Sequence, residues 1–397
     1  MHELLSVDEM GRADALTIKR GKPGIELMEN AGEAVFRVVQ HVLAQTGGGK
    51  VLVACGLGNN GGDGSVVARM LAAHGYQVKL AFAGNTEKIS GDAAIALERW
   101  GGQTANLADV DPSGFALIVD ALLGAGLDRD VKGAIGEFIH KINESGKPVV
   151  AVDLPSGIDG NAGAVMGVAV RAVHTVTFFR KKPGHLCFPG KSHCGEVSVA
   201  DIGIGSEVLD EIKPQFSENQ PGLWYWQLPK YRSDGHKYSR GHALIVSGGQ
   251  SRTGAARLAA EAALRSGAGL VTLASPPEAL ATNADHLTAV MLLRMEGSDG
   301  LKDILRDKRL SAIGMGPAMG LGQTAREKVV IALGSGRNVV LDADALTCFE
   351  DQPDQLFEMI SAASGDVVLT PHQGEFVRLF GKKDRQAKLQ VAINASK

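Results

Sequence analysis

The first half of the chain alternates between helix-like and strand-like patterns of apolar residues. Residues 23–45 open with Pro23-Gly24 and carry apolar side chains at helical spacing, which predicts a long amphipathic helix. Short β-branched runs follow, separated by stretches long enough for helices. The runs predict strands at 51–54, 78–83, 117–119, 149–152 and 173–179, and the intervening stretches predict helices at 66–74, 91–100 and 131–145. This alternation predicts a mostly parallel, doubly wound sheet in a three-layer αβα domain.

A second series of the same kind follows a break in the pattern. Between about residues 205 and 235 the chain becomes polar and proline-rich, which is typical of a linker. Further strands are expected at 243–246, 270–274, 312–313, 339–341 and 367–369, and a last helix at 384–395 has no strand after it. We therefore expect one domain at 1–210, a linker at 211–235 and a second α/β domain at 236–397, because 397 residues exceed the usual size of one core.

Composition and charge narrow the class of protein. Apolar residues make up 44% and charged residues 21% of the chain, with a net charge of −3, which is typical of a globular protein without a nucleic-acid or membrane-surface partner. The four cysteines form no C-x-x-C pair, the N-terminus lacks the basic and apolar pattern of a signal peptide, and no apolar run is long enough to span a bilayer. We expect reduced thiols and a cytoplasmic protein.

The loop after the first strand is the most informative segment. Residues 56–64 read GLGNNGGDG, so five of nine positions are glycine. Glycines let backbone amides approach a ligand closely, and the N-terminus of the following helix favours a phosphate or diphosphate. Gly56, Gly58 and Gly61 match G-x-G-x-x-G, but the second strand ends in Ala83-Gly84-Asn85, without the acid that holds a ribose in dinucleotide-binding Rossmann folds. A turn required only by packing would not need the polar Asn59, Asn60 and Asp63.

Two aspartates follow buried strands at the same expected edge of the sheet. Asp120 and Asp153 each either cap the next loop or face the ligand cleft. Because parallel strands bring their carboxyl ends together, a hard cation held by oxygens of Asn60, Asp120 and Ser156 is one possibility.

Nine sequence motifs point to a known family. The first half carries GLGNNGGDG, VDALLGAGLDRD, VDLPSG and FFRKKPGH, and it resembles the NAD(P)H-hydrate epimerases. The second half carries HKYSRGHALIVSGG, GAARLAAEAALRSGAG, GMGP, LDADAL and LTPHQGEF, and it resembles the ADP-dependent NAD(P)H-hydrate dehydratases, which have a ribokinase-like fold. Together the resemblance covers nearly the whole chain and implies the fused, bifunctional repair enzyme, a Rossmann-like domain followed by a ribokinase-like one.

The resemblance implies a set of site residues and cofactors. Potassium would be bound by Asn60, Asp120 and Ser156, and ADP and magnesium would serve the dehydratase half. The small-molecule substrate would be hydrated NADH or NADPH, and a homo-oligomer is expected. The residues that would contact the hydrate are Asn59, Asn60, Gly61, Gly62, Asp63, Gly124, Ala125, Gly126, Leu127, Asp128, Arg129, Asp130 and Asp153 in the first half, and Ala255, Gly316 and His372 in the second.

One departure from the family pattern concerns the end of the chain. Dehydratases of this kind carry, after the PHxGE segment, a phosphate-gripping loop and a G-x-G-D motif with a catalytic aspartate, and the sequence stops at Lys397 before them. We expect from this that the second domain is truncated, incomplete as a ribokinase-like fold and inactive as a dehydratase.

The expected chemistry is acid–base catalysis by a carboxyl group. The hydrate carries a hydroxyl on the carbon next to the ring nitrogen, so one positioned acid can help the hydroxyl leave and water return from either face. Asp153 is the candidate, and Lys182 is expected either to tune it or to lie in a solvated basic loop. Three alternatives stay open: a Rossmann dehydrogenase, a ribokinase-like vitamin kinase and a non-catalytic nucleotide-binding or interaction protein.

Overall fold

The chain divides into two compact units in the computed structural model, which describes residues 2–228, 230, 235–381 and 388–396. The first unit runs to Trp226 and also includes the C-terminal helix α16 (Lys388–Ala395). The second begins at Gln227. Positions 384–387 of the helix expected at 384–395 lie outside the described residues, and the domain bounds expected from the sequence stay a prediction.

The first unit is built on a parallel sheet, as the alternating pattern predicts. Its strand order is β4-β3-β2-β5-β6-β7-β8, and every neighbouring pair is parallel. The five expected strands are present, while β4 and β8, at the two edges, were not predicted. The bounds are β2 Val51–Cys55, β3 Val78–Phe82, β4 Thr104–Asn106, β5 Leu117–Ala121, β6 Val149–Val152, β7 His174–Phe178 and β8 Glu196–Ala200.

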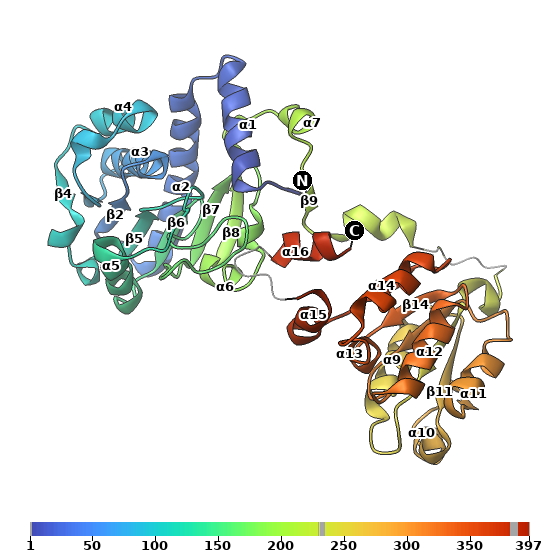
Figure 1. The fold of residues 1–397 in the computed structure, drawn as a ribbon. Coiled ribbons are helices and arrows are strands. Elements are labelled where there is room, and N and C mark those ends of the chain that lie inside the picture. Colours follow the sequence, from blue (N-terminus) through green and yellow to red (C-terminus); the bar gives the residue numbers. More distant parts are fainter. Residues whose placement is uncertain (1, 229, 231–234, 382–387, 397) are drawn as a thin grey trace. The chain divides into compact units, whose positions relative to one another are not determined.

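Helices cover both faces of this sheet (Figure 1). Helices α2 (Gly24–Thr46) and α3 (Asn59–Ala73) pack on the face that carries Val53 and Val119, and α4 (Gly91–Trp100) packs on α3. On the other face, α5 (Gly133–Glu144) packs against Leu52 and Ile118. The central strands are therefore buried on both sides, which explains their continuous apolar runs.

An additional helix, α1 (Val7–Lys19), precedes the predicted series. Its N-terminus has a capping box: Ser6 Oγ accepts a hydrogen bond from Glu9 N at 3.2 Å, and Glu9 Oε2 accepts one from Ser6 N at 2.8 Å. The first unit also has short elements outside the large sheet, among which β1 pairs antiparallel with β9. These elements are β1 Glu3–Leu4, α6 Lys191–Cys194, α7 Val208–Ile212, β9 Phe216–Ser217 and α8 Pro221–Trp224.

The second unit has a six-stranded parallel sheet in the order β12-β11-β10-β13-β14-β15. Of its strands only β12 was not predicted. The strands are β10 His242–Val246, β11 Leu270–Ser275, β12 Met291–Arg294, β13 Ala312–Met315, β14 Asn338–Leu341 and β15 Val367–Leu369. The helices are α9 Gly254–Arg265, α10 Leu280–Ala284, α11 Gly297–Ile304, α12 Gln323–Leu333, α13 Asp344–Thr347, α14 Pro353–Ala362 and α15 Gln373–Phe380.

The two faces of the second sheet are covered unequally. One face carries the larger core, which includes Leu244, Leu341 and Val329 of α12. On the other face α9 packs against Ile245 of β10 and Leu273 of β11. The register places Val340 and Val368 on this same face, and they are 42% and 51% exposed. Among the described residues, then, this face is covered over β10 and β11 but not over β14 and β15. Within the same part of the chain, no helix is both long and apolar enough to cross a membrane.

The capping box of α1 gives a direct test of this helix. Ser6→Ala removes a side chain that accepts from the helix backbone, so the free energy of unfolding should fall by about 0.5–2 kcal/mol, measured by urea denaturation. Ser90→Ala is the matched control, because Ser90 is also an N-cap, of α4, but its side chain makes no capping hydrogen bond. Equal losses in the two variants would contradict the role assigned to Ser6.

Candidate active site

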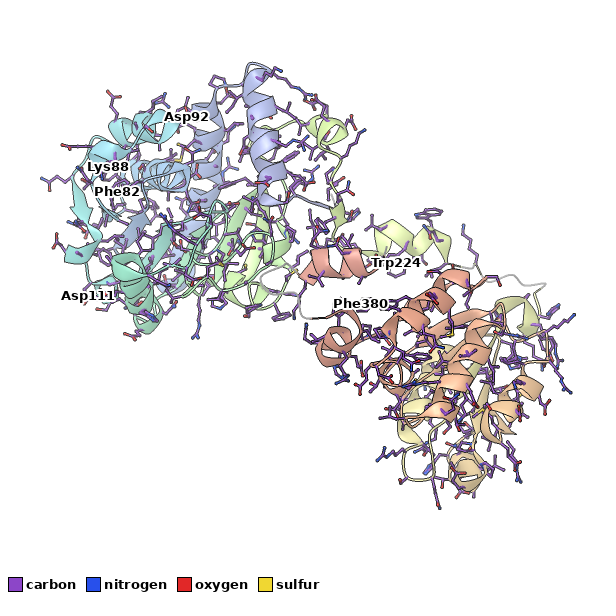
Figure 2. The ribbon with its side chains drawn as sticks, in the orientation of Figure 1. Phe82, Lys88, Asp92, Asp111, Trp224 and Phe380 are labelled. Atoms are coloured by element: carbon purple, nitrogen blue, oxygen red, sulfur yellow. The ribbon has the colours of Figure 1, made fainter. Side chains whose placement is uncertain are left out.

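A cavity of about 690 Å³ opens at the carboxyl edge of the first sheet. Its walls come from the loop after β2, the start of α3, the loop after β5, the residue after β6 and the segment after β7, together with α1 and the start of α2. Asp92, at the start of α4, also lines it and is labelled in Figure 2. The cavity thus lies where ligands bind in open parallel sheets.

The glycine-rich loop brings backbone amides to this cavity. Strand β2 ends at Cys55, Gly58 is the N-cap of α3, and the helix begins at Asn59. A Cβ on Gly56 would lie 1.9 Å from the carbonyl oxygen of Leu122, and one on Gly61 would lie 2.0 Å from that of Gly56. Only glycine fits at these two positions. The tight turn points the N-terminus of α3, a binding site for negatively charged groups, into the cavity.

Asp153 is held in one position by a set of hydrogen bonds. It follows β6 with a φ of 65°, in the left-handed region that non-glycine residues rarely adopt. Its Oδ1 accepts from Lys182 Nζ at 2.5 Å and from Thr177 Oγ1 at 3.0 Å, and its Oδ2 accepts from the backbone amide of Ala125 at 3.3 Å. The carboxylate is thereby tied both to the β7 segment and to the loop after β5.

Lys182 is buried beside this carboxylate, with 1% of its side chain exposed against 14% for Asp153. Burial by itself raises the pKa of Asp153, but the Lys182 ammonium and the hydrogen bonds outweigh it, so the pKa lies below its usual value. Asp153 is therefore ionised at neutral pH. The alternative of a solvated Lys182 is excluded.

His185 supports the backbone of both residues. Its Nδ1 accepts from Lys182 N at 2.9 Å, which leaves the proton on Nε2, and Nε2 donates to the carbonyl oxygen of Asp153 at 2.8 Å. Burial, together with the charge of Lys182, lowers the pKa of His185 to about 4. The imidazole is therefore neutral at pH 7 and acts as a structural support for the ion pair.

Two further carboxyl groups line the same cavity. Burial, together with the charges of Asp153 and Asp14, raises the pKa of Asp63 well above its usual value. For Asp14, on α1, burial raises the pKa to about 6; Lys182 opposes this shift and Asp153 adds to it. The cavity therefore combines an ionised carboxylate with carboxyl groups that hold protons more tightly.

Asp120, Ser156 and Asn60 lie close together next to the cavity. Asp120 is fully buried, and its two oxygens accept from Ser156 Oγ at 2.5 Å and Ser156 N at 2.8 Å. The loop after β5 joins them to Asn60: Leu123 N donates to Ser156 Oγ at 2.9 Å, and a Cβ on Gly124 would lie 3.1 Å from Asn60 Oδ1.

This group has the properties of a hard-cation site. Burial raises the pKa of Asp120 to about 6, although the hydrogen bonds from Ser156 oppose the shift. Within the described part of the chain no basic side chain pairs with Asp120. A cation would compensate a buried carboxylate of this kind, and oxygen donors suit a hard ion.

Most of the residues expected in the first site line the cavity. They are Asn59, Asn60, Asp63, Gly124, Ala125, Gly126, Leu127, Asp128, Arg129 and Asp153. Gly61 and Gly62 are buried in the first turn of α3 without lining it, and Asp130 is exposed outside it. Asp120 and Ser156 are buried next to it. The assignment of these residues to a ligand stays a prediction.

The three residues expected in the second site follow strands at one edge of the second sheet. Ala255 is an exposed residue in the first turn of α9, after β10. Gly316 follows β13 with a φ of 137°, and a Cβ there would lie 1.7 Å from the carbonyl oxygen of Asp342. His372 caps α15, after β15, by accepting from Gly374 N at 2.9 Å. No hydrogen bond joins any two of them in the described part of this unit.

Sequence reasoning missed the contribution of the N-terminal helix to the cavity. Val7, Met10, Gly11, Asp14 and Ile18 all line it from α1. A signal was present, because Ser6-x-x-Glu9 has the spacing of a capping box. His185 was also missed, and its role is not visible in a sequence pattern because it acts through backbone groups.

Comparison with known protein families agrees with the two-unit architecture. Residues 24–184 match the family described as YjeF-related protein N-terminus, and residues 243–397 match the family described as NAD(P)H-hydrate dehydratase. The second match extends to residue 397, so the expectation of a truncated and inactive dehydratase domain is not supported. That expectation depended on motifs not found before Lys397, whereas the family match depends on the residues that are present.

Several relatives are similar to this chain over most of its length. The bifunctional NAD(P)H-hydrate repair enzyme Nnr of Coxiella burnetii is 36% identical over 376 residues, which cover 93% of this chain and 74% of the relative. The enzymes of the same name from Moorella thermoacetica and Escherichia coli are 34% and 35% identical, over 98% and 90% of this chain and 77% and 67% of their own lengths.

Among solved structures, a yeast protein is 21% identical with a TM-score of 0.46, over 55% of this chain and 96% of its own. An ADP/ATP-dependent NAD(P)H-hydrate dehydratase from Bacillus subtilis, crystallised with ATP and Mg²⁺, is 28% identical with a TM-score of 0.31, over 39% of this chain and 52% of its own. The identity shared with the three relatives spans both units, and the chain therefore belongs to the family of bifunctional NAD(P)H-hydrate repair enzymes.

Proposed function

We propose that the first unit interconverts the R and S hydrates of NADH and NADPH in the cavity around Asp153. The observation that carries this proposal is the pairing, in one cavity, of a helix N-terminus suited to a diphosphate with a buried, ionised carboxylate. A protein that only binds a nucleotide has no need to hold an aspartate at a φ of 65° against a buried lysine. This argues against the non-catalytic alternative.

The dinucleotide would lie across the carboxyl edge of the sheet. Backbone amides of Asn59, Asn60 and Gly61 at the start of α3 would bind the diphosphate, because the first amides of a helix have no partner within it. The loop of residues 124–130 would hold the rest of the substrate, and Ala125 links that loop to Asp153 through its hydrogen bond at 3.3 Å. The hydrated ring would then lie beside the carboxylate.

Asp153 would act as acid and base at the hydroxyl-bearing carbon. The ring nitrogen lone pair expels the hydroxyl as water when a proton is supplied to it, and water then adds back to the iminium carbon while a carboxylate accepts its proton. Addition to the opposite face inverts the centre. No net oxidation or reduction occurs. Lys182 would hold the charge of Asp153, and Thr177 would fix its orientation.

The second unit is proposed to convert the S hydrate to NAD(P)H with ADP and magnesium. Ala255, Gly316 and His372 follow strands of one sheet edge, where a ligand would bind in an α/β fold. The two units would act in sequence, since the first supplies the S hydrate from the R hydrate and the second consumes it. A cytoplasmic location and a homo-oligomer remain predictions.

A potassium ion is proposed at Asn60, Asp120 and Ser156. It would compensate the charge of Asp120, which lies directly behind the loop that contacts Asp153. The ion would thereby order the 122–125 backbone and place the Ala125 amide, while the acid–base steps would stay with the carboxyl groups.

Asp153→Asn tests the proposed function. The change keeps the shape of the side chain and removes its acid–base chemistry, so epimerisation should fall about 10²–10⁴-fold. The R and S hydrates are separated by chromatography. In the presence of ADP and Mg²⁺, the wild type should consume a racemic hydrate completely and the variant only its S half. Asp109→Asn is the control, because Asp109 is exposed and lies outside the cavity. An unchanged rate in Asp153→Asn would remove this residue from the mechanism.

Lys182→Met tests the origin of the charge on Asp153. Without the ammonium group only burial and weaker hydrogen bonds remain, so the pKa of Asp153 should rise, as followed by carbon NMR of the carboxyl group. Breaking a buried pair should also lower the free energy of unfolding by about 3–5 kcal/mol at pH 7. A depressed carboxyl pKa stabilises the fold only while the group is ionised, so this difference should shrink as the pH falls below about 4.

Lys181→Met is the matched control for that variant. Lys181 pairs with Glu218 at 3.0 Å, but both side chains are partly solvated, at 23% and 25% exposure. Its loss should cost at most about 1 kcal/mol. Equal effects of the two substitutions would contradict the account of the Lys182–Asp153 pair.

Potassium binding is tested by thermal unfolding. Replacing choline chloride with potassium chloride at constant ionic strength should raise Tm of the wild type, by an amount that corresponds to about 2.7 kcal/mol at one hundred times Kd. Asp120→Asn should lose this response, while Asp109→Asn should retain it. A potassium response of the same size in Asp120→Asn would exclude the site.

A further inference from the structure

Helix α1 presents one stripe of side chains to the cavity. The lining residues are Val7, Met10, Gly11, Asp14 and Ile18, a spacing that places them on a single helical face. These residues precede residue 24, where the match to the epimerase-type family begins. The helix is therefore a wall of the site that lies outside the matched segment.

Contacts on its other faces fix this helix in place. Ala13 and Thr17 are buried, and Arg20, at its end, donates to Glu211 on α7 at 2.5 Å. Just before the helix, Leu5 N donates to the carbonyl oxygen of Lys181 at 3.0 Å, next to Lys182. The position of α1 is thus tied to the segment that carries the ammonium group of the site.

Gly11 leaves space on the stripe beside Asp14. It is exposed within the helix, lines the cavity, and a Cβ added there would meet nothing within 4 Å. Glycine inside a helix costs about 0.5–1 kcal/mol relative to alanine. Among the described residues, no packing contact requires a glycine at position 11, whereas the need for ligand space next to Asp14 would explain it.

Asp14 has no protein partner to explain its position. It is half-buried and lines the cavity, yet within the described part of the chain its carboxyl group makes no hydrogen bond and no ion pair. The charged and titratable groups that act on it are Lys182 after β7, Asp153 after β6 and Asp63 on α3. A carboxyl group turned to a cavity with no partner is available to a ligand.

We propose that Asp14 is a second catalytic carboxyl group, which acts on one face of the hydrated ring while Asp153 acts on the other. This inference depends on the proposed function. Each face of the reacting carbon then has its own carboxyl group to donate and accept protons. Asp14 comes from α1, and Asp153 comes from the segment after β6.

The proton balance of such a reaction closes without a further reactant. Asp14 gives its proton to the hydroxyl, the carbon–oxygen bond breaks, and water leaves as the nitrogen lone pair forms the iminium. A second water adds to the opposite face of that carbon and gives a proton to Asp153. The product has the inverted configuration, with Asp14 left ionised and Asp153 protonated. Proton exchange with solvent then moves one proton from Asp153 back to Asp14 before the next turnover. The reverse reaction uses the two residues in exchanged roles.

Asp14 suits this role better than Asp63. Burial raises the pKa of Asp14 to about 6, so both of its forms are populated near neutral pH, whereas burial and the charges of Asp153 and Asp14 raise the pKa of Asp63 well above its usual value. The ionised Asp153 is the matching base. The rate in the direction that needs protonated Asp14 should therefore fall about tenfold per pH unit above pH 6.

Exchange of oxygen with ¹⁸O-labelled water separates this role from a structural one. In Asp14→Asn, the protonated form of Asp153 can still expel water from the face that it serves, and the ionised form can accept a proton when water returns to that face. The hydrate should therefore continue to exchange its oxygen, within about tenfold of the wild-type rate, while inversion falls at least about 100-fold. Asp14→Glu should restore part of the inversion. Asp8→Asn, at an exposed position of the same helix outside the cavity, should match the wild type.

Two outcomes would overturn the assignment of Asp14. One is inversion by Asp14→Asn within twofold of the wild type; the other is a parallel loss of exchange and inversion, which a merely positioning residue would give. Failure of the proposed function looks different, because wild-type protein would then accelerate neither exchange nor inversion over the rate in buffer.

Discussion

The buried ion pair between Lys182 and Asp153 is the interaction on which the first unit's chemistry depends. Removing two charges from water is unfavourable unless their remaining hydrogen-bonding capacity is met. Here Thr177 and the amide of Ala125 complete the shell of the carboxylate, while Thr177 also accepts from Lys182 at 3.0 Å. A neutral His185 holds the backbone of both partners. The pair therefore fixes the geometry and the charge of one carboxylate in the wall of a cavity.

The parallel sheet explains how residues far apart in the sequence reach this pair. Strands β2, β5, β6 and β7 are neighbours in the sheet, so the loops that follow them meet at one edge. Gly56 allows the loop after β2 to pack against the loop after β5, and Gly61 allows the first of these loops to turn tightly on itself. Where the two loops meet, Asn60 lies beside Gly124. The neighbouring Leu123 donates to Ser156, which in turn donates to Asp120. The proposed cation site and the proposed catalytic site thus share one loop.

Much of this arrangement could be predicted from the sequence. The β-branched runs identified ten of the thirteen strands in the two large sheets, because buried parallel strands are continuously apolar. The edge strands β4, β8 and β12 were not predicted, because they are only partly buried and lack such runs. Lys182 could be named as a candidate but not assigned, since a basic loop and a buried countercharge look alike in a sequence. Asp14 was missed because its neighbours in space come from other elements, and the pattern of α1 was weakened by Gly11.

The most direct test is a crystal structure of Asp153→Asn with a bound hydrate of NADH. We expect the diphosphate to contact the amides at the start of α3 and the hydroxyl-bearing carbon to lie between the side chains of residues 14 and 153. A hydrate bound elsewhere, or one whose reduced ring points away from residue 153, would contradict it.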